Sequence, residues 1–323
     1  GAVSGSTQAT VVAMGGTLRP RLLERGYSDS FSLALIINAS DVALLIPPSI
    51  GMIVYGVVSG TSVGELFIAG ILPGLLVLGI FSLYCRVASH WQGVPPLPRA
   101  PWSARWRALR GAILPLGFPV LVIGGIYAGV FSPTEAAAAS VLYALVLEVG
   151  VYRAVHLSDL GELAVSTGLI TSVVFVLVAA GAAFSWAISF ARIPDRLLGP
   201  VLETAASEPT QLLLILSAAY FVGCMFVDPI VVIMILTPIF APAVAASGVD
   251  PVMVGVLVTL QAAIGSATPP FGCDIFTAMA VFRRPYLEVI RGTPPFLVML
   301  LAVTVLLILF PPLSLALRDL AFR

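Results

Sequence analysis

Residues 38–56, NASDVALLIPPSIGMIVYG, decide the fold that this sequence predicts. They lie inside an apolar run from about Phe31 to Val58, which is long enough to cross a bilayer. Pro47 and Pro48 stand in the middle of this run, where they remove two amide donors and break a helix. Freed backbone groups are tolerated at membrane depth only where protein or a water-filled cavity satisfies them. The stretch therefore predicts a discontinuous helix that lines a cavity, as in many secondary transporters.

The same device occurs a second time, near the other end of the chain. Residues 259–276, TLQAAIGSATPPFGCDIF, place Pro269 and Pro270 inside another apolar run. A single proline pair also fits a kinked structural helix, and that interpretation remains open for either pair alone. Two pairs in corresponding places favour two discontinuous helices.

The composition predicts an all-α polytopic membrane protein. The chain has 323 residues, of which 59% are hydrophobic and 10% are charged, with a mean hydropathy of +1.07. A soluble domain has about 25% charged residues. The net charge is zero and all 16 basic residues are arginine, with no basic stripe, so we expect no nucleic-acid partner.

The sequence contains no pattern typical of a transition-metal site or a cofactor. The cysteines at positions 85, 224 and 273 lack metal-type spacing, and we expect them to be buried, reduced and structural. Both histidines lie in polar loops, and there is no Walker motif. The chain begins with Gly1 in a stretch of small residues, without an initiator Met or a signal peptide, and we interpret this as an N-terminal truncation.

The first 85 residues are interpreted as one structural unit. Gly1–Gly16 fits the second half of a re-entrant hairpin, because it is small and rich in hydroxyl groups and is too weakly apolar to face lipid alone. The elements expected after it are a polar loop at Leu18–Ser30, the broken helix to Ser59, and a span at Leu66–Ala88 that is interrupted at Pro73.

Residues 86–110 form the longest polar segment, with five arginines and no acid, which places them in the cytoplasm. Four prolines predict an extended linker here. Residues 111–210 then supply connecting and scaffold helices, expected at 112–131, 136–152, 157–163 (short and amphipathic) and 164–190. Glu135 follows Ser132 and Pro133 and is interpreted as part of a capping box.

Residues 211–323 are interpreted as the second unit. A span at 211–227, the pair Asp228-Pro229 and an apolar segment at 230–246 resemble a second re-entrant hairpin. The second broken helix is expected from about Val252 to Phe282, followed by a basic turn at Arg283–Arg291 and a last span at Pro294–Leu317.

The two units form an internal repeat at an offset of 222 residues. This shift superimposes six prolines and glycines without a gap, pairing 20 with 242, 26 with 248, 47 with 269, 48 with 270, 70 with 292 and 73 with 295. The loop before the first broken helix has three arginines and its partner has none, whereas the turn after it has none and its partner has three. Basic loops face the cytoplasm, so the repeat is predicted to be inverted in the membrane.

The sequence as a whole resembles a known family, the large membrane subunit (DctM type) of tripartite ATP-independent periplasmic (TRAP) transporters. The matching stretches cover nearly the whole chain in order: AVSGST, ERGYS, LIPPSIGMIVYGVVSGTSVGELFIAGILPG, GGIYAGVFSPTEAAA, FSWAISFARIP, MFVDPIVVIMILTPIFAP, IGSATPPFGCDIF and FPPLSL. The resemblance implies a sodium-coupled, elevator-type importer of organic acids such as C4-dicarboxylates in the bacterial inner membrane. A small four-helix membrane subunit and a periplasmic substrate-binding protein would be its partners, beside membrane lipid.

The resemblance also implies two sodium sites with the substrate between them. The first would use Ser4, Gly5, Ser6, Asn38, Ser40 and Pro47, and the second Asp228, Gly265, Thr268 and Pro269. The substrate would contact Ser6, Pro48, Ser49, Asp228, Pro270 and Gly272. Hydroxyl groups and the carbonyls freed at a helix break suit sodium. Small hydroxyl residues also let helices approach closely, so both interpretations remain open for each serine.

Three acids receive individual interpretations. Asp228 stands at an apolar junction, where a carboxylate is costly, and is interpreted as an ion ligand or the cap of a hairpin tip. Asp41 and Asp274 depart from the family, which often has a hydroxyl residue and Asn at these positions, and they alter the charge balance with an anionic substrate. They are interpreted as caps of half-helices, with a link to proton movement as the alternative.

Three other functions remain as alternatives to sodium-coupled import. Proton coupling keeps the fold and changes only the ion. An intramembrane aspartyl protease could use Asp228 and Asp274, but its GxGD-type motif is missing, so we expect no enzyme activity. A channel subunit would allow uncoupled flux, which paired closed hairpins disfavour.

Overall fold

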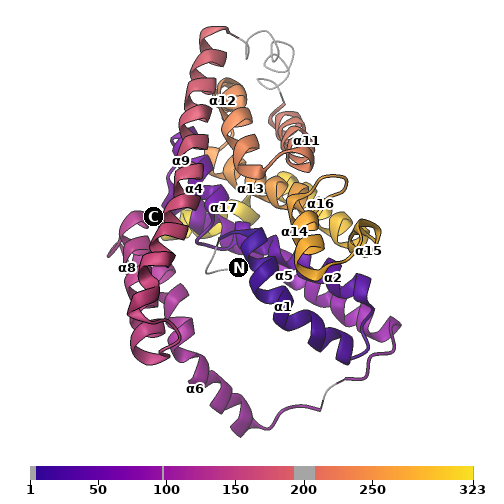
Figure 1. Ribbon diagram of the computed structural model, residues 1–323. Helices are drawn as coiled ribbons and strands as arrows, with labels where there is room; N and C mark the ends of the chain where they lie inside the picture. The colour runs from indigo at the N-terminus through magenta and orange to yellow at the C-terminus, as the bar shows by residue number, and fades with distance from the viewer. Residues whose placement is uncertain (1–4, 97, 193–207, 323) are drawn as a thin grey trace. The chain divides into compact units, whose positions relative to one another are not determined.

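The computed structural model describes residues 5–96, 98–192 and 208–322, and over these ranges the chain is helical without any strand (Figure 1). Seven of the helices described are long and apolar enough to cross a membrane, or eight if one bent pair is a single span. The prediction of an all-α polytopic membrane protein is confirmed. The chain divides into two compact units, one of residues 1–95 and 181–323 and the other of residues 96–180.

Both broken helices are present at the predicted places. The first consists of α2 (Asp29–Ser40), α3 (Val42–Leu45) and α4 (Ile50–Ser59), and the second of α13 (Pro251–Ser266) and α14 (Cys273–Phe282). The Pro47-Pro48 and Pro269-Pro270 bonds lie between the halves, and both are cis. Each break leaves a short non-helical segment, in which Pro47 and Ser49 of the first break are buried whereas Pro270 and Phe271 of the second are exposed.

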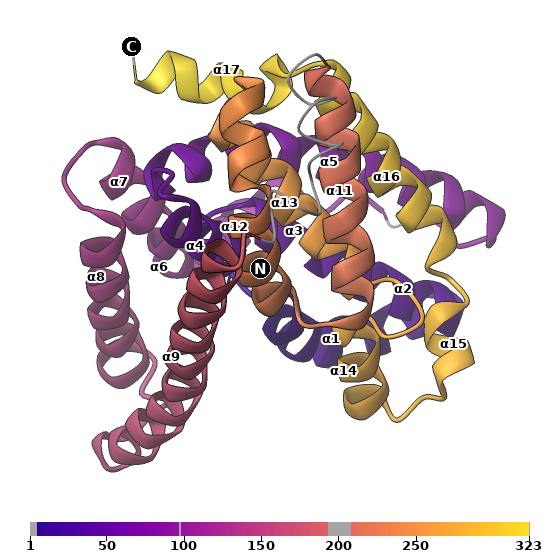
Figure 2. The ribbon, with the colours of Figure 1, turned by 90° about the horizontal axis from the view of Figure 1, so that it is seen from above.

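Helix α13 forms the centre of the larger unit. Every residue from Val252 to Ser266 is buried, and α13 contacts α3, α4, α11 (Pro209–Phe226) and α12 (Pro229–Ser247), among which it appears in Figure 2. Its one amide side chain is satisfied, because Gln261 donates to the Thr304 hydroxyl at 2.8 Å. A helix that is apolar on all sides is expected where other helices surround it.

The offset of 222 residues recurs in the helix boundaries. Helix α2 begins at Asp29 and α13 at Pro251, and the loops before them contain Gly26 and Gly248, both with a positive φ. The contacts repeat as well: α1 (Thr7–Glu24) contacts α2 and α14, and α12 contacts α13 and α4. Each of α1 and α12 therefore contacts the first half of the broken helix that follows it and the second half of the other broken helix.

Two expectations for the first 91 residues were wrong. Helix α1 continues to Glu24, so the predicted polar loop from Leu18 is much shorter, and Arg19 within the helix pairs with Asp29 at 2.7 Å. Helix α5 (Val63–Trp91) runs through Pro73 without the predicted interruption. A lone proline removes only one donor, and the contacts of α5 with α3, α13, α16 (Pro294–Leu309) and α17 (Pro312–Ala321) support the helix around it.

The extended linker predicted at residues 86–110 is shorter in the structure. Because α5 ends at Trp91 and α6 (Trp102–Pro119) begins well before Arg110, the chain outside helices is much shorter than residues 86–110. Helix α6 continues through a π-helical turn at Val120–Gly124 into α7 (Gly125–Tyr127), and the last part of this stretch is the span expected at 112–131.

The rest of the smaller unit follows the predicted order. Helix α8 (Pro133–Leu145) continues as a π-helical segment at Val146–Val151, and its predicted capping box is confirmed, since Ser132 and Glu135 cap each other's backbone. A 3₁₀ turn at Leu157–Asp159 leads into α9 (Leu160–Phe190), so the two segments predicted between 157 and 190 form one continuous helical stretch.

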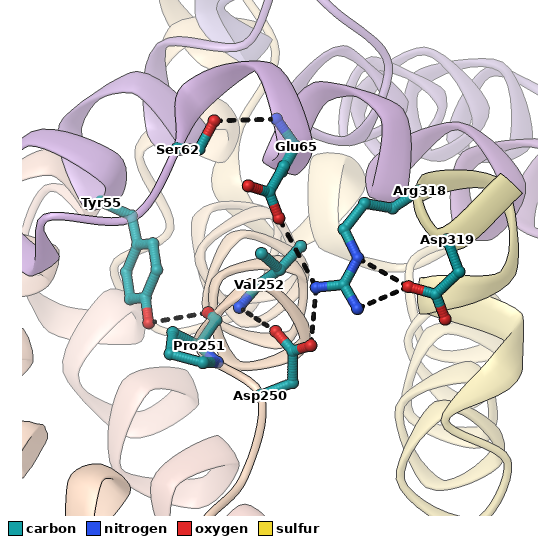
Figure 3. Close-up of polar contacts among 8 residues, drawn as sticks. All are labelled: Tyr55, Ser62, Glu65, Asp250, Pro251, Val252, Arg318 and Asp319. Atoms are coloured by element: carbon teal, nitrogen blue, oxygen red, sulfur yellow. Dashed lines mark hydrogen bonds and ion pairs between the residues drawn. The ribbon is translucent and has the colours of Figure 1, made fainter. Parts of the chain in front are cut away.

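The C-terminal region ends differently from the prediction. The short α15 (Tyr286–Ile290) leads to α16, where the last span stops at Leu309. The chain then bends by 61° at Pro311-Pro312 into α17. Arg318 of α17 lies among three carboxylates, at 2.6 Å from Asp250, 2.7 Å from Asp319 and 3.7 Å from Glu65 (Figure 3). This cluster connects α17 with the starts of α5 and α13.

Candidate substrate and ion site at the two helix breaks

A cavity of about 70 Å³ lies where the beginning of α1 meets the beginnings of α4 and α12. It brings together three of the predicted site residues, the adjacent Gly5 and Ser6 and the distant Asp228. No basic side chain lines it among the described residues. The other lining residues are Thr7, Gln8, Leu44, Ile50, Gly51, Pro229, Ile230, Ile233 and Ala262.

The tip before α1 is seated directly on the first helix break. The Gly5 carbonyl accepts a hydrogen bond from the Ile50 amide at 3.3 Å, and Gly5 has a φ of +60°. A Cβ at this position would run into the Pro48 carbonyl, so the contact requires glycine. Ser6 caps α1 by accepting a hydrogen bond from the Ala9 amide at 3.4 Å. Ser4 lies outside the described residues.

The polar side chains of the first break bond to the backbone of their own segment. Ser49 is fully buried, caps α4 through the Met52 amide at 3.2 Å, and donates to the Leu44 carbonyl at 2.6 Å. Asn38 and Ser40 are also buried and donate to backbone carbonyls one turn earlier, at 2.8 and 2.7 Å. In each of these side chains the oxygen still has a lone pair that a cation can use.

Asp228 is placed at the cavity by the start of α12. Its carboxylate accepts a hydrogen bond from the Ile230 amide at 2.9 Å, and Pro229 occupies the first helical position, where its missing N–H is harmless. The interpretation of Asp228 as a cap is therefore confirmed. Asp228 is only partly buried and lines the cavity together with Ser6. Its carboxylate therefore faces the space between the start of α1 and the start of α12.

The remaining predicted residues of the second break are not among those that line the cavity. Thr268 donates to the Ile264 carbonyl at 2.5 Å, and its own carbonyl accepts from the Gly272 amide at 3.1 Å. The Pro270 carbonyl accepts from the Tyr286 hydroxyl at 3.0 Å. Pro269 lies in the same break, and Gly265 is packed so tightly on Cys224 that a Cβ would collide with it. These contacts hold the break in one shape.

Asp274 was predicted to cap a half-helix, and this was wrong. It lies in the first turn of α14, but its two oxygens accept hydrogen bonds from the hydroxyls of Thr7 at 2.8 Å and Ser266 at 2.9 Å. The carboxylate is completely buried, and Thr7 is also a cavity residue. Sequence reasoning missed Thr7 and Ser266; the only sign of Thr7 was its place next to Ser6.

Asp41 is also not a cap. It precedes α3 without a side-chain capping bond, because α2 leads into α3 with helical backbone angles and leaves no free amide within reach. The residue is 1% exposed, and neither carboxylate oxygen has a protein hydrogen-bond partner among the described residues. An acid in this setting is costly, which makes the first break a candidate functional position.

The cysteines are free thiols, as expected, but only Cys224 is buried, whereas Cys85 and Cys273 are half-buried. Over the part of the chain that the structure describes, no three His, Cys, Asp or Glu side chains are grouped to hold a metal ion. The ligands available at the two breaks are carbonyls, hydroxyls and carboxylates, which suit an alkali cation better than a transition metal.

Comparison with known proteins adds the family context. Residues 1–313 match the family model described as the DctM component of tripartite ATP-independent periplasmic transporters. The chain is 65% identical to the ectoine TRAP transporter large permease protein TeaC of Halomonas elongata and 66% identical to the ectoine/5-hydroxyectoine protein UehC of Ruegeria pomeroyi. Each alignment covers 100% of this chain and 75% of the relative. The C4-dicarboxylate protein DctM of Pseudomonas aeruginosa is 34% identical, over 98% of this chain and 74% of that relative.

Proposed function

The chain belongs to the DctM family of tripartite ATP-independent periplasmic transporters, and from this premise we propose that it imports ectoine or 5-hydroxyectoine. As a large permease of this family it is an inner-membrane transporter and not an enzyme. It works with a small membrane subunit and a periplasmic binding protein.

The observation that carries the proposed substrate is the difference in identity between two groups of relatives. Two proteins named for ectoine are 65% and 66% identical to this chain, whereas a protein named for C4-dicarboxylates is 34% identical. We therefore replace the expected C4-dicarboxylate with ectoine. The substrate keeps the carboxylate that the sequence analysis expected and gains a positive group.

The charges at the cavity support this choice. Ectoine is a zwitterion, with one carboxylate and one delocalised amidinium cation. Asp228 faces the cavity, the Asp274 carboxylate lies behind Thr7, and no basic side chain lines the cavity among the described residues. Besides its part in the second sodium site proposed below, the Asp228 carboxylate can pair with an amidinium, a group that a dicarboxylate does not have.

For coupling, we propose that sodium binds at the two breaks and that the hairpins and broken helices move together as an elevator. The ligands in this proposal are those expected from the sequence: Ser4, Gly5, Ser6, Asn38, Ser40 and Pro47 at the first break, and Asp228, Gly265, Thr268 and Pro269 at the second. Carbonyls freed at a helix break are suited to sodium. The direct contact of Gly5 with the first break supports a common ion site there.

A competition experiment tests the substrate. The permease is reconstituted with its small subunit and binding protein, and uptake of labelled ectoine is measured in the presence of excess unlabelled compounds. We expect 5-hydroxyectoine to suppress the uptake and succinate to leave it unchanged. Vesicles without the permease give the background. Uptake of labelled succinate, with no uptake of ectoine, would contradict the proposed substrate.

A further inference from the structure

The first three turns of α6 carry an apolar stripe that no other part of the smaller unit covers. Trp102, Trp106, Leu109 and Ile113 follow one another at intervals of four, three and four residues, which places them on one face of the helix. Their side chains are 77%, 52%, 46% and 57% exposed. Helix α6 has no buried residue over its whole described length.

Arginines flank this stripe on both sides. At about 100° per residue, Arg105 and Arg110 lie on opposite edges of the stripe, and Arg107 lies further round toward the polar face. The Arg105 guanidinium is 5.7 Å from the centre of the Trp102 ring, and that of Arg110 is 5.6 Å from the centre of the Trp106 ring. Each edge arginine is thus held against a tryptophan.

The positive charge of this segment has no counter-charge in contact with it among the residues that the structure describes. Arg105, Arg107 and Arg110 are all exposed and form no ion pair with any residue that the structure describes. Residues 66–134 contain no acid at all. An anion from outside the chain is the natural partner of such a cluster.

The length of the helix places this cluster at the membrane surface. The candidate span Trp102–Tyr127 has 26 residues, which is about 39 Å of helix, and the hydrocarbon core is about 30 Å thick. The segment after Arg110 accounts for most of that core, so the two turns before it lie at headgroup level. Tryptophan is enriched there, and arginine extends toward the phosphates from that depth.

From this combination we propose that the start of α6 is a binding site for anionic phospholipid headgroups of the cytoplasmic leaflet. Arg105 and Arg110 bind the lipid phosphate through paired N–H groups, and Trp102 and Trp106 lie against the upper acyl chains. The cytoplasmic side follows from the excess of arginine in residues 86–110. The site anchors the beginning of α6 at a fixed depth.

The tryptophans themselves provide the test. The permease, with its partner proteins, is reconstituted in phosphatidylcholine vesicles that contain a small fraction of brominated phosphatidylglycerol or brominated phosphatidylcholine. Bromine quenches tryptophan emission on contact, and a Trp102→Phe/Trp106→Phe variant gives the emission of all other tryptophans. We expect phosphatidylglycerol to quench Trp102 and Trp106 at least about fivefold more effectively than phosphatidylcholine at equal fraction.

Two arginine variants examine the geometry of the site. Arg105→Gln/Arg110→Gln is expected to abolish the preference for phosphatidylglycerol, whereas Arg107→Gln, which removes a charge away from the stripe, should keep most of it. Arg105→Lys/Arg110→Lys should retain part of the preference, because the charge remains and the paired donors are lost. Equal quenching by both lipids in the wild type overturns the proposal, as does a preference that survives Arg105→Gln/Arg110→Gln. Absence of quenching by either lipid also overturns it and indicates that protein, such as the small membrane subunit, covers the stripe.

Discussion

The Thr7 hydroxyl donates a 2.8 Å hydrogen bond to the carboxylate of Asp274, a residue 267 positions further along the chain. This bond connects the first helical turn of α1 with the second half of the second broken helix. Ser266 completes the group by donating to the other carboxylate oxygen at 2.9 Å. Because Thr7 also lines the cavity, the buried carboxyl group of Asp274 lies one side chain behind the cavity.

Replacing Asp274 should separate the structural from the electrostatic role of this carboxylate. Asp274→Ala leaves the buried Thr7 hydroxyl without its acceptor, whereas Ser266 keeps the Ala263 carbonyl at 2.8 Å, and we expect the free energy of unfolding to fall by about 2 kcal/mol. Asp274→Asn keeps the size and one acceptor, so it should unfold closer to the wild type while its apparent KM for ectoine rises. Denaturant unfolding in micelles and uptake in vesicles measure the two effects. An unchanged KM in Asp274→Asn would show that the charge has no separate role in transport.

Gly5 should not tolerate a side chain. Gly5→Ala forces a residue with a Cβ into a φ of +60° and drives that Cβ into the Pro48 carbonyl, so the tip cannot seat on the first break. We expect ectoine uptake to fall more than about tenfold. Gly16→Ala is the matched control, because a Cβ at Gly16 meets nothing within 4 Å and alanine favours a helix. Normal uptake by Gly5→Ala would refute the seating of the tip.

The charge of Asp228 should matter for transport more than for folding. Asparagine caps helices about as well as aspartate, so Asp228→Asn is expected to keep α12 intact while it removes the negative charge from the cavity. We expect the apparent KM for ectoine to rise about tenfold or more, as for the loss of a charged hydrogen bond. Asp250→Asn makes the same substitution at the cap of α13, outside the cavity, where it also removes the ion pair with Arg318. The account fails on this point if the two variants raise KM equally.

The Arg318 cluster should stabilise the larger unit in a salt-dependent way. Arg318→Gln removes the ion pairs that connect α17 with the starts of α5 and α13, and these pairs are partly exposed. We expect a loss of about 1 kcal/mol at low salt that shrinks as salt is added. Arg291→Gln removes an exposed arginine that has no ion pair among the described residues, and thermal unfolding of the two variants in parallel gives the comparison. A loss that is independent of salt would point to lost packing instead.

The sequence predicted the features that depend on a single local cause. The pairs Pro47-Pro48 and Pro269-Pro270 each remove two adjacent donors, and both breaks are where the sequence placed them. Pro73 removes only one, and the helix continues because its neighbours support it. Local reasoning also predicted the cap at Asp228, whose bonding partner lies two residues away.

The features that the sequence did not predict depend on contacts between distant segments. Asp274 has the spacing of a helix cap, but its partner Thr7 comes from the other end of the chain. Asp41 has no hydrogen-bond partner among the described residues, and no sequence pattern distinguishes such an acid from a cap. Helix α6 begins inside the polar segment 86–110. Trp102 and Trp106 lie on one face of this helix and the arginines lie beside and opposite them, so the segment is amphipathic rather than extended.

The most direct test of the account is the driving force of ectoine uptake. The complete permease is reconstituted with its small subunit and binding protein, and labelled ectoine is supplied with an inward sodium gradient, with a pH gradient alone, or with neither. We predict uptake only when both sodium and the binding protein are present. Uptake that a pH gradient drives in the absence of sodium, or that proceeds without the binding protein, would contradict the account.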